Sequence, residues 1–289
     1  MSTLQSLSQT PLSLIHHAFE DAFADYQVAI SMPEERLAEM MRTRSYDAEL
    51  SLGYFVDEEL AGFILTGYRE MAGRRCAYDV ATGVIRAFQK QGVGDVLLSA
   101  QLQNLRERGM DCFLLEVLEN NPAAQKLYLK NGFSITRRFN CYQKALTPHT
   151  AQAQRVDETV RLATDIMTLD ERLYSGFQPS WQNSFASLRA AIDVYRIAVL
   201  REGNVIVAYG IVHKERGGIL QAGLHPEYRN AAMLERLLQQ LAGLTIAGRL
   251  VFLNVEEGSF TDQCLPQLGF TPDTAQFEMC WQAVSQNHA

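Results

Sequence analysis

The stretch Gln89-Lys90-Gln91-Gly92-Val93-Gly94 lies between a strand-like run and a long amphipathic helix pattern. Its two glycines allow unusual backbone angles and let a ligand approach the backbone closely. The first turn of a helix carries unpaired N–H groups and a partial positive charge, so this stretch has the features of an anion site. Taken alone, it is more simply a strand-to-helix turn, because it lacks the fingerprint GxGxxG and the GKS or GKT ending of nucleotide-binding loops.

The residues around this stretch alternate between helical and strand-like patterns. Apolar spacing of three and four predicts helices, and short runs rich in apolar and β-branched residues predict strands. Asn121 is a plausible cap for the last helix of this series, and Gly132 is a good stop. The expected elements are a helix over 12–26, a helix over 32–44, strands over 50–56, 60–68 and 75–85, a helix over 93–108, a strand over 112–118 and a helix over 122–130.

A second informative stretch is LEVLENNPAAQKLYLKNGF, residues 115–133. Glu116 interrupts an apolar strand, and a buried carboxylate is costly unless it is paired or its pKa rises. A raised carboxylate pKa suits a general base, whereas a structural Glu held by backbone amides or an arginine is an equally good interpretation. Tyr128 lies on the following helix, where by itself it is best explained as a packing residue with its hydroxyl at the rim.

Together the two stretches resemble the GNAT superfamily of acyl-CoA N-acyltransferases. The family's phosphate-binding pattern is Gln/Arg-x-x-Gly-x-Gly/Ala, which residues 89–94 match. Its later pattern is Asn-x-x-Ala-x-x-Leu-Tyr-x-x-x-Gly-Phe. This chain fits the later pattern at every named position, with Asn121, Ala124, Leu127, Tyr128, Gly132 and Phe133. The resemblance covers about residues 1–146.

The resemblance implies an α/β fold with a mixed, mostly antiparallel sheet flanked by helices, whose fourth and fifth strands are parallel but splay apart. Acetyl-CoA is the implied co-substrate, with its pantetheine arm in that gap and its pyrophosphate on the amides of 89–94. Tyr128 matches the tyrosine that protonates the departing thiolate. Glu116 matches a base of ribosomal-protein alanine N-acetyltransferases, and Asp79 through water is an alternative base. The implied cofactor-binding residues are Val84, Ile85, Arg86, Gln89, Lys90, Gln91, Gly92, Val93, Gly94, Asn121, Ala124 and Tyr128.

The second half of the chain weakly repeats the first. The offset is 140 residues at the helix (Leu97 to Leu237) and 137 at the Gly-Phe pair (Gly132 to Gly269). A period this long indicates a duplicated domain. We therefore expect two tandem GNAT-like domains, a catalytic one over 1–146 and a second over 157–289, joined by a linker over 147–156.

The second half departs from the pattern at the positions that carry chemistry. Gln89, Gly92, Gly94, Glu116 and Tyr128 correspond to Arg229, Ala232, Leu234, Asn254 and Leu265. Two β-carbons stand where a backbone would approach phosphate, so this half is expected to be degenerate and to bind no acyl-CoA productively. We expect it to help wall the acceptor cleft. The stretch 18–26, with Phe19, Phe23, Tyr26 and several acids, is expected near the acceptor side or simply as core and solvated face.

Composition limits the remaining choices. In 289 residues, 47% are hydrophobic and 20% charged, as in a globular protein, and the net charge of −7 argues against a nucleic-acid partner while allowing an amine substrate. No signal peptide or membrane span is evident, and no Cys or His spacing suggests a metal. The five cysteines are widely spaced, which favours reduced, mostly buried thiols and a cytoplasmic location. A monomer and a homodimer are both compatible with the sequence.

The leading hypothesis is therefore an acetyl-CoA-dependent N-acetyltransferase that acts by direct attack of a primary amine, from a small molecule or a peptide N-terminus. The alternative is a non-catalytic acyl-CoA-binding sensor or partner-binding module. A third possibility is a different donor, as in tandem GNATs that make small thiols or use aminoacyl-tRNA, and the acidic charge disfavours tRNA.

Overall fold

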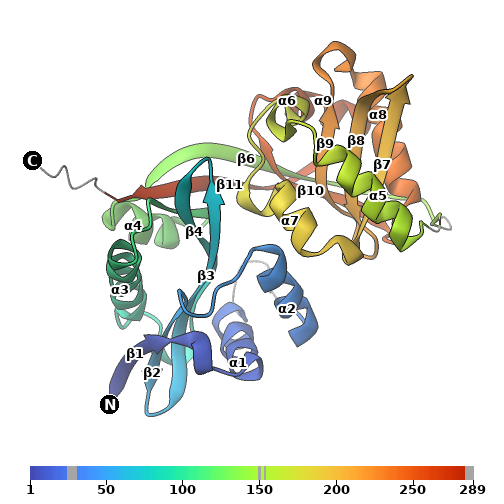
Figure 1. The fold of residues 1–289 in the computed structure, drawn as a ribbon. Helices are drawn as coiled ribbons and strands as arrows, with labels where there is room; N and C mark the ends of the chain where they lie inside the picture. Colours follow the sequence, from blue (N-terminus) through green and yellow to red (C-terminus); the bar gives the residue numbers. More distant parts are fainter. Residues whose placement is uncertain (25–30, 149–150, 153, 284–289) are drawn as a thin grey trace, which may run out of the picture. The chain divides into compact units, whose positions relative to one another are not determined.

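The computed structural model describes residues 1–24, 31–148, 151–152 and 154–283. The chain forms two compact units that are not two consecutive segments. Unit 1 comprises Met1–Val117, Asn121–Thr136 and Glu278–Ala289, and unit 2 comprises Leu118–Asn120 and Arg137–Phe277. Each unit is a mixed sheet flanked by helices, as expected from the sequence (Figure 1).

Unit 1 contains the expected elements and one strand at the N-terminus that the patterns did not predict. Its sheet has the order β1-β2-β3-β4-β5, followed by the end of β11 and the start of β6. Asp57 and Glu58 have positive φ and form the tight turn between β2 and β3. The elements are β1 (Ser2–Ser6), η1 (Leu7–Gln9), α1 (Leu12–Phe23), α2 (Glu34–Thr43), β2 (Leu52–Val56), β3 (Glu59–Met71), β4 (Arg74–Val84), η2 (Arg86–Phe88), α3 (Val93–Glu107), β5 (Cys112–Leu118) and α4 (Pro122–Lys130).

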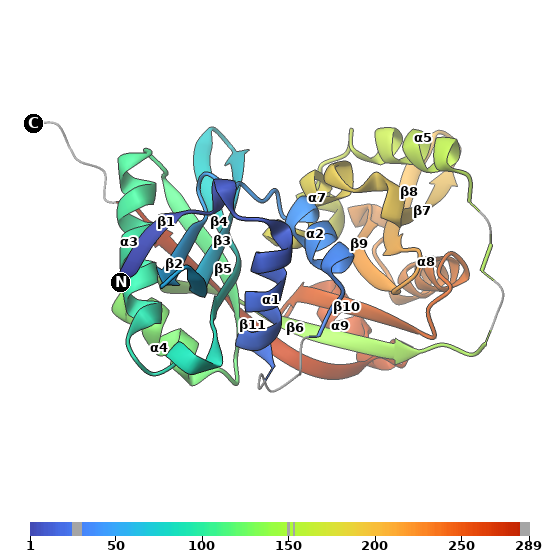
Figure 2. The ribbon, with the colours of Figure 1, turned by 90° about the horizontal axis from the view of Figure 1, so that it is seen from below.

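Helices α1 and α3 cover opposite faces of the unit 1 sheet (Figure 2). A Cβ on Gly62 would meet Leu97 of α3, whereas a Cβ on Gly83 would meet Ala22 of α1. Phe63 also faces α1, because its ring lies 6.3 Å from that of Phe19. Since successive side chains of a strand alternate between faces, these contacts fix which positions of β3 and β4 point to each helix layer.

Two strands contribute residues to both units. β6 (Ser134–Ala145) begins in unit 1 and continues in unit 2, and β11 (Thr271–Gln282) begins in unit 2 and ends in unit 1. The boundary expected at residue 146 therefore does not coincide with the edge of a compact unit. β6 therefore ends in unit 2, and β11 ends in unit 1.

Unit 2 has the sheet order β11-β6-β10-β9-β8-β7, again with helices on both faces. Leu241 of α8 lies where a Cβ on Gly210 would point, and Tyr209, the preceding residue in the strand, packs on Tyr174 and Phe185 from the other face. Its remaining elements are α5 (Val156–Ile166), α6 (Glu171–Ser175), η3 (Trp181–Asn183), α7 (Phe185–Ala190), η4 (Ile192–Val194), β7 (Tyr195–Glu202), β8 (Val205–His213), β9 (Gly218–Leu224), η5 (Pro226–Tyr228), α8 (Ala231–Gly243), β10 (Arg249–Glu256), α9 (Phe260–Cys264) and η6 (Pro266–Leu268).

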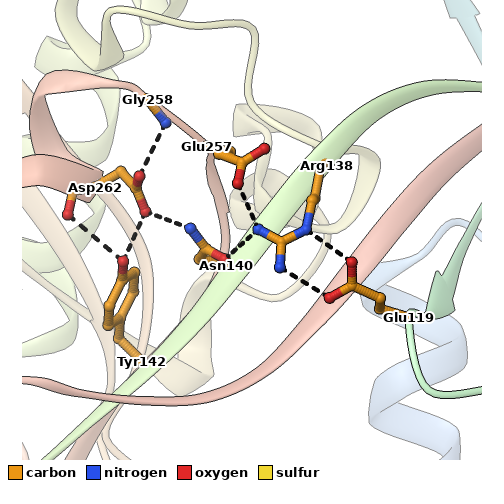
Figure 3. Close-up of polar contacts among 7 residues, drawn as sticks. All are labelled: Glu119, Arg138, Asn140, Tyr142, Glu257, Gly258 and Asp262. Carbon is orange, nitrogen blue, oxygen red and sulfur yellow. Dashed lines mark hydrogen bonds and ion pairs between the residues drawn. The ribbon is translucent and has the colours of Figure 1, made fainter.

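A polar network explains why β6 and the loop at 118–120 group with unit 2 (Figure 3). Arg138 of β6 forms ion pairs with Glu119 at 2.8 Å and with Glu257 at 2.7 Å. Further along β6, Asn140 and Tyr142 both donate to Asp262 of α9, at 2.8 and 2.7 Å. Hydrogen bonds to charged groups are among the stronger ones, so this network fixes β6 to α9 and to two loops of unit 2.

Candidate active site

The parallel strands β4 and β5 separate in the middle of unit 1. Their pairing is Cys76 with Cys112, Ala77 with Phe113 and Tyr78 with Leu114, and it ends there although both strands continue. Beyond this point β4 loses its neighbour on one side. The splayed parallel pair that the resemblance implies is therefore present.

A bulge in β4 lies directly beyond the last pair. Thr66 of β3 pairs with Asp79 and Leu65 with Ala81, so Val80 is the extra residue. A bulge bends its strand and leaves one residue outside the ladder. Arg44 follows α2 and donates to the Val80 carbonyl at 2.9 Å, which satisfies that group.

Gly67 brings Arg44 to the bulge. The segment after α2 crosses β3 so closely that a Cβ on Gly67 would lie 2.3 Å from the Arg44 carbonyl oxygen. Real β-carbons do not approach a backbone oxygen to that distance, so only glycine fits there. The contact fixes the position of the segment from which the Arg44 guanidinium reaches β4.

Asp79 and Tyr128 form the first of two tyrosine–carboxylate pairs. The Tyr128 hydroxyl of α4 donates to Asp79 Oδ2 at 3.0 Å, and Thr82 donates to the same oxygen at 2.7 Å. Burial raises the pKa of Asp79 to about 6, against the two hydrogen bonds and the charge of Arg44, which lower it. Asp79 Oδ1 is buried and has no hydrogen-bond partner within the described part of the chain.

Tyr78 and Glu116 form the second pair, with the Tyr78 hydroxyl donating to Glu116 Oε2. Burial, with the nearby Glu116 charge, raises the pKa of Tyr78 well above its ordinary value. Leu114 pairs with Tyr78, so Glu116, two residues further along β5, projects from the same face as Tyr78. The register thus places these two side chains together.

The two pairs lie on opposite faces of the sheet. Asp79 is opposite Thr66, whose hydroxyl accepts a hydrogen bond from Gln101 of α3, so Asp79 faces the α3 and α4 layer. Tyr78 precedes Asp79 in the strand and therefore faces the α1 layer. The structure thus brings Asp79 to Tyr128 and keeps Glu116 apart from both.

The glycine-rich stretch forms an open helix start. Gly92 has φ 84° and is the N-cap of α3, with no side-chain cap. A Cβ on Gly92 would meet nothing within 4 Å, whereas one on Gly94 would lie 3.6 Å from Leu127. The first intrahelical bond runs from Val96 to the Gly92 carbonyl, so the N–H groups before it lack helical partners. Lys90, also at positive φ, is exposed.

At the end of β4, Val84 directs its backbone polar groups to the side from which β5 has separated. The Ile85 N–H donates to Ala61 of β3 at 3.0 Å, so by alternation the N–H and C=O of Val84 face away from β3. The Val84 carbonyl accepts from the Gln89 side chain at 3.0 Å. Arg86 is directed elsewhere, because its N–H and guanidinium donate to Asp21 at 2.7 and 2.9 Å.

The later motif holds α4 in place. Asn121 caps the helix, with its Oδ1 accepting from the Ala124 N–H at 3.1 Å, as expected from the sequence. The Tyr128 ring packs edge-on against Phe133, with 5.3 Å between centroids. The side chain of Gln91 donates to the Ala87 carbonyl at 2.7 Å, and Val93 is buried as the first residue of α3.

Sequence reasoning missed three residues of this site, namely Tyr78, Thr82 and Arg44. Tyr78 lies beside Glu116 because of the parallel register of β4 and β5, which the sequence does not show, and Arg44 lies far away in sequence and carries no motif. On the α1 side, Asp21 is paired with Arg86 and Phe19 is buried. Residues 25 and 26 of the expected acceptor-side stretch lie outside the described residues.

The corresponding positions of unit 2 are occupied differently. Arg229 donates to the carbonyls of Tyr174 and Leu224, both at 3.3 Å. Asn254 is fully buried and donates to Ser180 at 3.0 Å. Leu265 is also fully buried, so a hydroxyl like that of Tyr128 has no counterpart at its position. These side chains serve packing and internal hydrogen bonds within unit 2.

All five cysteines are free and buried, as expected. Among the described residues, no group of three or more His, Cys, Asp or Glu side chains could hold a metal ion, and no helix is long and apolar enough to cross a membrane.

A mixed sheet whose central parallel strands separate beside a glycine-started helix is the arrangement that the resemblance to GNAT acyltransferases implies. The model of the Acetyltransferase (GNAT) family matches residues 14–133, so this part of the chain is similar to GNAT acetyltransferases. A curated relative, the [Ribosomal protein bS18]-alanine N-acetyltransferase of Haemophilus ducreyi, is 47% identical over 57 residues. That match covers 19% of this chain and 39% of the relative's length.

Solved structures extend the similarity of fold to both units. A GCN5-related N-acetyltransferase from Sphaerobacter thermophilus has a TM-score of 0.70 at 12% identity, covering 97% of this chain and 95% of that one. A tandem GNAT protein from the clavulanic acid biosynthesis pathway has a TM-score of 0.65 at 12% identity, covering 99% and 100%. The tandem organisation predicted from the internal repeat is therefore confirmed at the level of the fold.

Asp79 should lower the stability of the fold at neutral pH. Its pKa of about 6 in the folded state exceeds the ordinary 3.8, so the folded state binds more protons between these values and stability falls as pH rises through them. We expect Asp79→Asn to stabilise the protein above pH 6 by up to about 3 kcal/mol, and to have little effect below pH ~4. Urea unfolding across this pH range measures the difference, and an equal effect at every pH would contradict it.

Proposed function

We propose that the protein is an N-acetyltransferase that transfers the acetyl group of acetyl-CoA to a primary amine by direct attack, and that unit 1 carries this activity. The observation that supports it most is the pair of tyrosine–carboxylate contacts on opposite faces of the sheet, at the point where β4 and β5 separate. This arrangement offers a base on one face and an acid on the other.

The start of α3 fits the phosphates of acetyl-CoA. Gly92 keeps an open space where any other residue would place a Cβ, and the N–H groups that follow it before Val96 have no helical partners. A helix start of this kind favours anions through its N–H groups and its dipole. In the proposal the amides of residues 89–94 hold the pyrophosphate, Val84 pairs with the pantetheine arm, and Asn121 and Ala124 contact that arm from α4.

Glu116 and Tyr128 divide the proton transfers. Glu116, on the α1 face, takes the proton that the amine must lose as it attacks the thioester. Tyr128, on the α4 face, supplies a proton to the thiolate sulfur as the C–S bond breaks. A backbone N–H of β4 beyond the bulge polarises the carbonyl, an oxyanion-type contact.

The acceptor class is a primary amine from a small molecule or a peptide N-terminus. The curated relative from Haemophilus ducreyi is named for an alanine of a ribosomal protein, which makes a peptide N-terminus a natural first test. The acidic net charge is compatible with a cationic amine. Buried free thiols support the cytoplasm as the location.

Unit 2 is proposed to be degenerate and to bind no acetyl-CoA productively. Arg229, Asn254 and Leu265 stand at the positions of Gln89, Glu116 and Tyr128, and each is committed to contacts inside unit 2. Residues 147–156 remain the proposed connection between the two family-like segments of the chain.

The direct test is amine-dependent release of free thiol from acetyl-CoA, measured with a panel of small primary amines and of peptides with different N-terminal residues. We expect at least one amine to be acetylated. Glu116→Gln should lower kcat/KM for it by about 10²-fold or more, the usual contribution of a general base. Glu107→Gln, at an exposed position of α3, should leave it unchanged. Tight acetyl-CoA binding without turnover of any amine would instead favour a sensor.

A further inference from the structure

The proposed function gives Asp79 no role, although this carboxyl group is buried. Its side chain is 8% exposed, and ionising it at neutral pH is costly because burial disfavours the charged form. A residue kept at such a cost is a candidate for function. The contacts of Asp79 lead to Tyr128, because both Tyr128 and Thr82 donate to its Oδ2.

We propose that Asp79 is a positioning residue that holds the Tyr128 hydroxyl in place and returns a proton to it when Tyr128 protonates the leaving thiolate. The inference rests on the proposed function and adds to it a second residue on the thiol side. It removes Asp79 from the alternatives for the base, because Asp79 faces the α4 layer and Glu116 projects from the other face.

The proposed step moves two protons. The C–S bond breaks with its electron pair on sulfur, and the Tyr128 O–H proton goes to that pair. The O–H pair stays on the Tyr128 oxygen. When the Tyr128 O–H is directed to the sulfur, its hydrogen bond with Asp79 Oδ2 reverses, and the Tyr128 oxygen takes the proton of the Asp79 carboxylic acid. Asp79 is left as a carboxylate and regains a proton from solvent after the product has gone. No oxidant or further reactant is needed.

The neighbours of Asp79 suit both of its protonation states. Thr82 from its own strand and Arg44 from the segment after α2 stabilise the carboxylate that the relay leaves behind. Tyr128 from α4 is the direct partner. Tyr78 and its partner Glu116 lie across the sheet, and their negative charge resides on Glu116. A pKa of Asp79 near 6 makes both forms accessible close to neutral pH.

Without the acid form, the relay would fail. If Asp79 were already ionised, proton donation by Tyr128 would leave a phenolate and a carboxylate side by side in a buried site, and two like charges in contact disfavour each other. The rate of thiolate protonation should therefore follow the protonated fraction of Asp79, which falls as pH rises.

The first test needs no turnover. In protein labelled with 13Cγ-aspartate, the resonance lost in Asp79→Asn identifies Asp79, and its titration by NMR gives its pKa. Thr82→Val and Tyr128→Phe each remove a hydrogen bond that lowers this pKa, so both should shift the titration to higher pH. Glu107→Gln, an exposed change at the last residue of α3, should leave it in place.

The second test is the pH dependence of kcat with the amine found by the panel, at saturating concentrations. The ratio of wild type to Asp79→Asn should be about tenfold or more at low pH and approach one as Asp79 ionises. In Thr82→Val, kcat should decline at a higher pH than it does in wild type. KM for acetyl-CoA should change little in both variants. The ratio of two kcat values measured at the same pH removes the contribution of the amine's own titration.

The outcomes separate the two proposals. If an amine is acetylated but the wild-type to Asp79→Asn ratio is constant with pH, the proposed function stands and the relay is overturned. If no amine is acetylated, the proposed function fails, and the NMR titrations decide whether Asp79 and Tyr128 act as a pair. An Asp79 titration unaffected by Tyr128→Phe overturns the pairing in either case.

Discussion

Tyr128→Phe is expected to lower kcat by about 10²- to 10⁴-fold, the range that one positioned acid or base contributes. The change removes one oxygen, which donates to Asp79 at 3.0 Å, and keeps the ring that packs on Phe133. Acetyl-CoA affinity should therefore stay within a few-fold of wild type. Stopped-flow measurement of thiol release with the amine found by the panel, together with calorimetric titration of acetyl-CoA, checks both expectations.

A matched control is available in the same unit. Tyr54 lies on β2 and also loses a single hydroxyl in Tyr54→Phe, but β3 separates it from β4 in the sheet order. We expect this variant to keep wild-type kcat. Equal activities of the Tyr54 and Tyr128 variants would show that another group protonates the thiolate.

The second large effect is expected from Gly92→Glu, which should weaken acetyl-CoA binding by about 100-fold or more, since a like charge placed against another costs several kcal/mol. Gly92 lies at φ 84° with open space in front of its α-carbon. The new side chain places a carboxylate where the phosphates are proposed to bind and strains the backbone. Isothermal titration with acetyl-CoA measures the loss, and a melting curve confirms that the variant is folded.

Ala232→Glu is the control in unit 2. Ala232 is exposed in the first turn of α8, where an acidic side chain is favourable with respect to the helix dipole. We expect no change in acetyl-CoA affinity. The reverse pattern, with binding lost in Ala232→Glu and kept in Gly92→Glu, would show that unit 2 binds acetyl-CoA and that unit 1 does not.

Much of unit 1 was predictable because its signals are local. β5 and α4 have the bounds that the sequence predicted, since an apolar run and a capped helix each end at residues that interrupt the pattern. Asn121 caps α4 as expected. α1 ends earlier than predicted within the described residues. β1 was missed, because its polar sequence STLQS has no apolar alternation and it becomes a strand only by pairing with β2.

The segments that make up each compact unit could not be predicted from the sequence. The repeat suggested a boundary near residue 146, yet β6 from Arg137 onward groups with unit 2 and the end of β11 groups with unit 1. The contacts responsible are long-range, such as Arg138 with Glu257 and Tyr142 with Asp262. Sequence spacing shows which segments are strands, but not which sheet a terminal strand joins.

By itself, the sequence indicated the resemblance to the family and, apart from β1, the order of elements in unit 1, because glycine positions, caps and apolar periods act over a few residues. It also indicated Tyr128, Glu116 and Asp79 as candidates. Only the tertiary structure assigned Asp79 to Tyr128 and Tyr78 to Glu116, on opposite faces of the sheet. The reason is physical: the face of a strand residue depends on register and on the bulge at Val80, and these are fixed by pairing with β3 and β5.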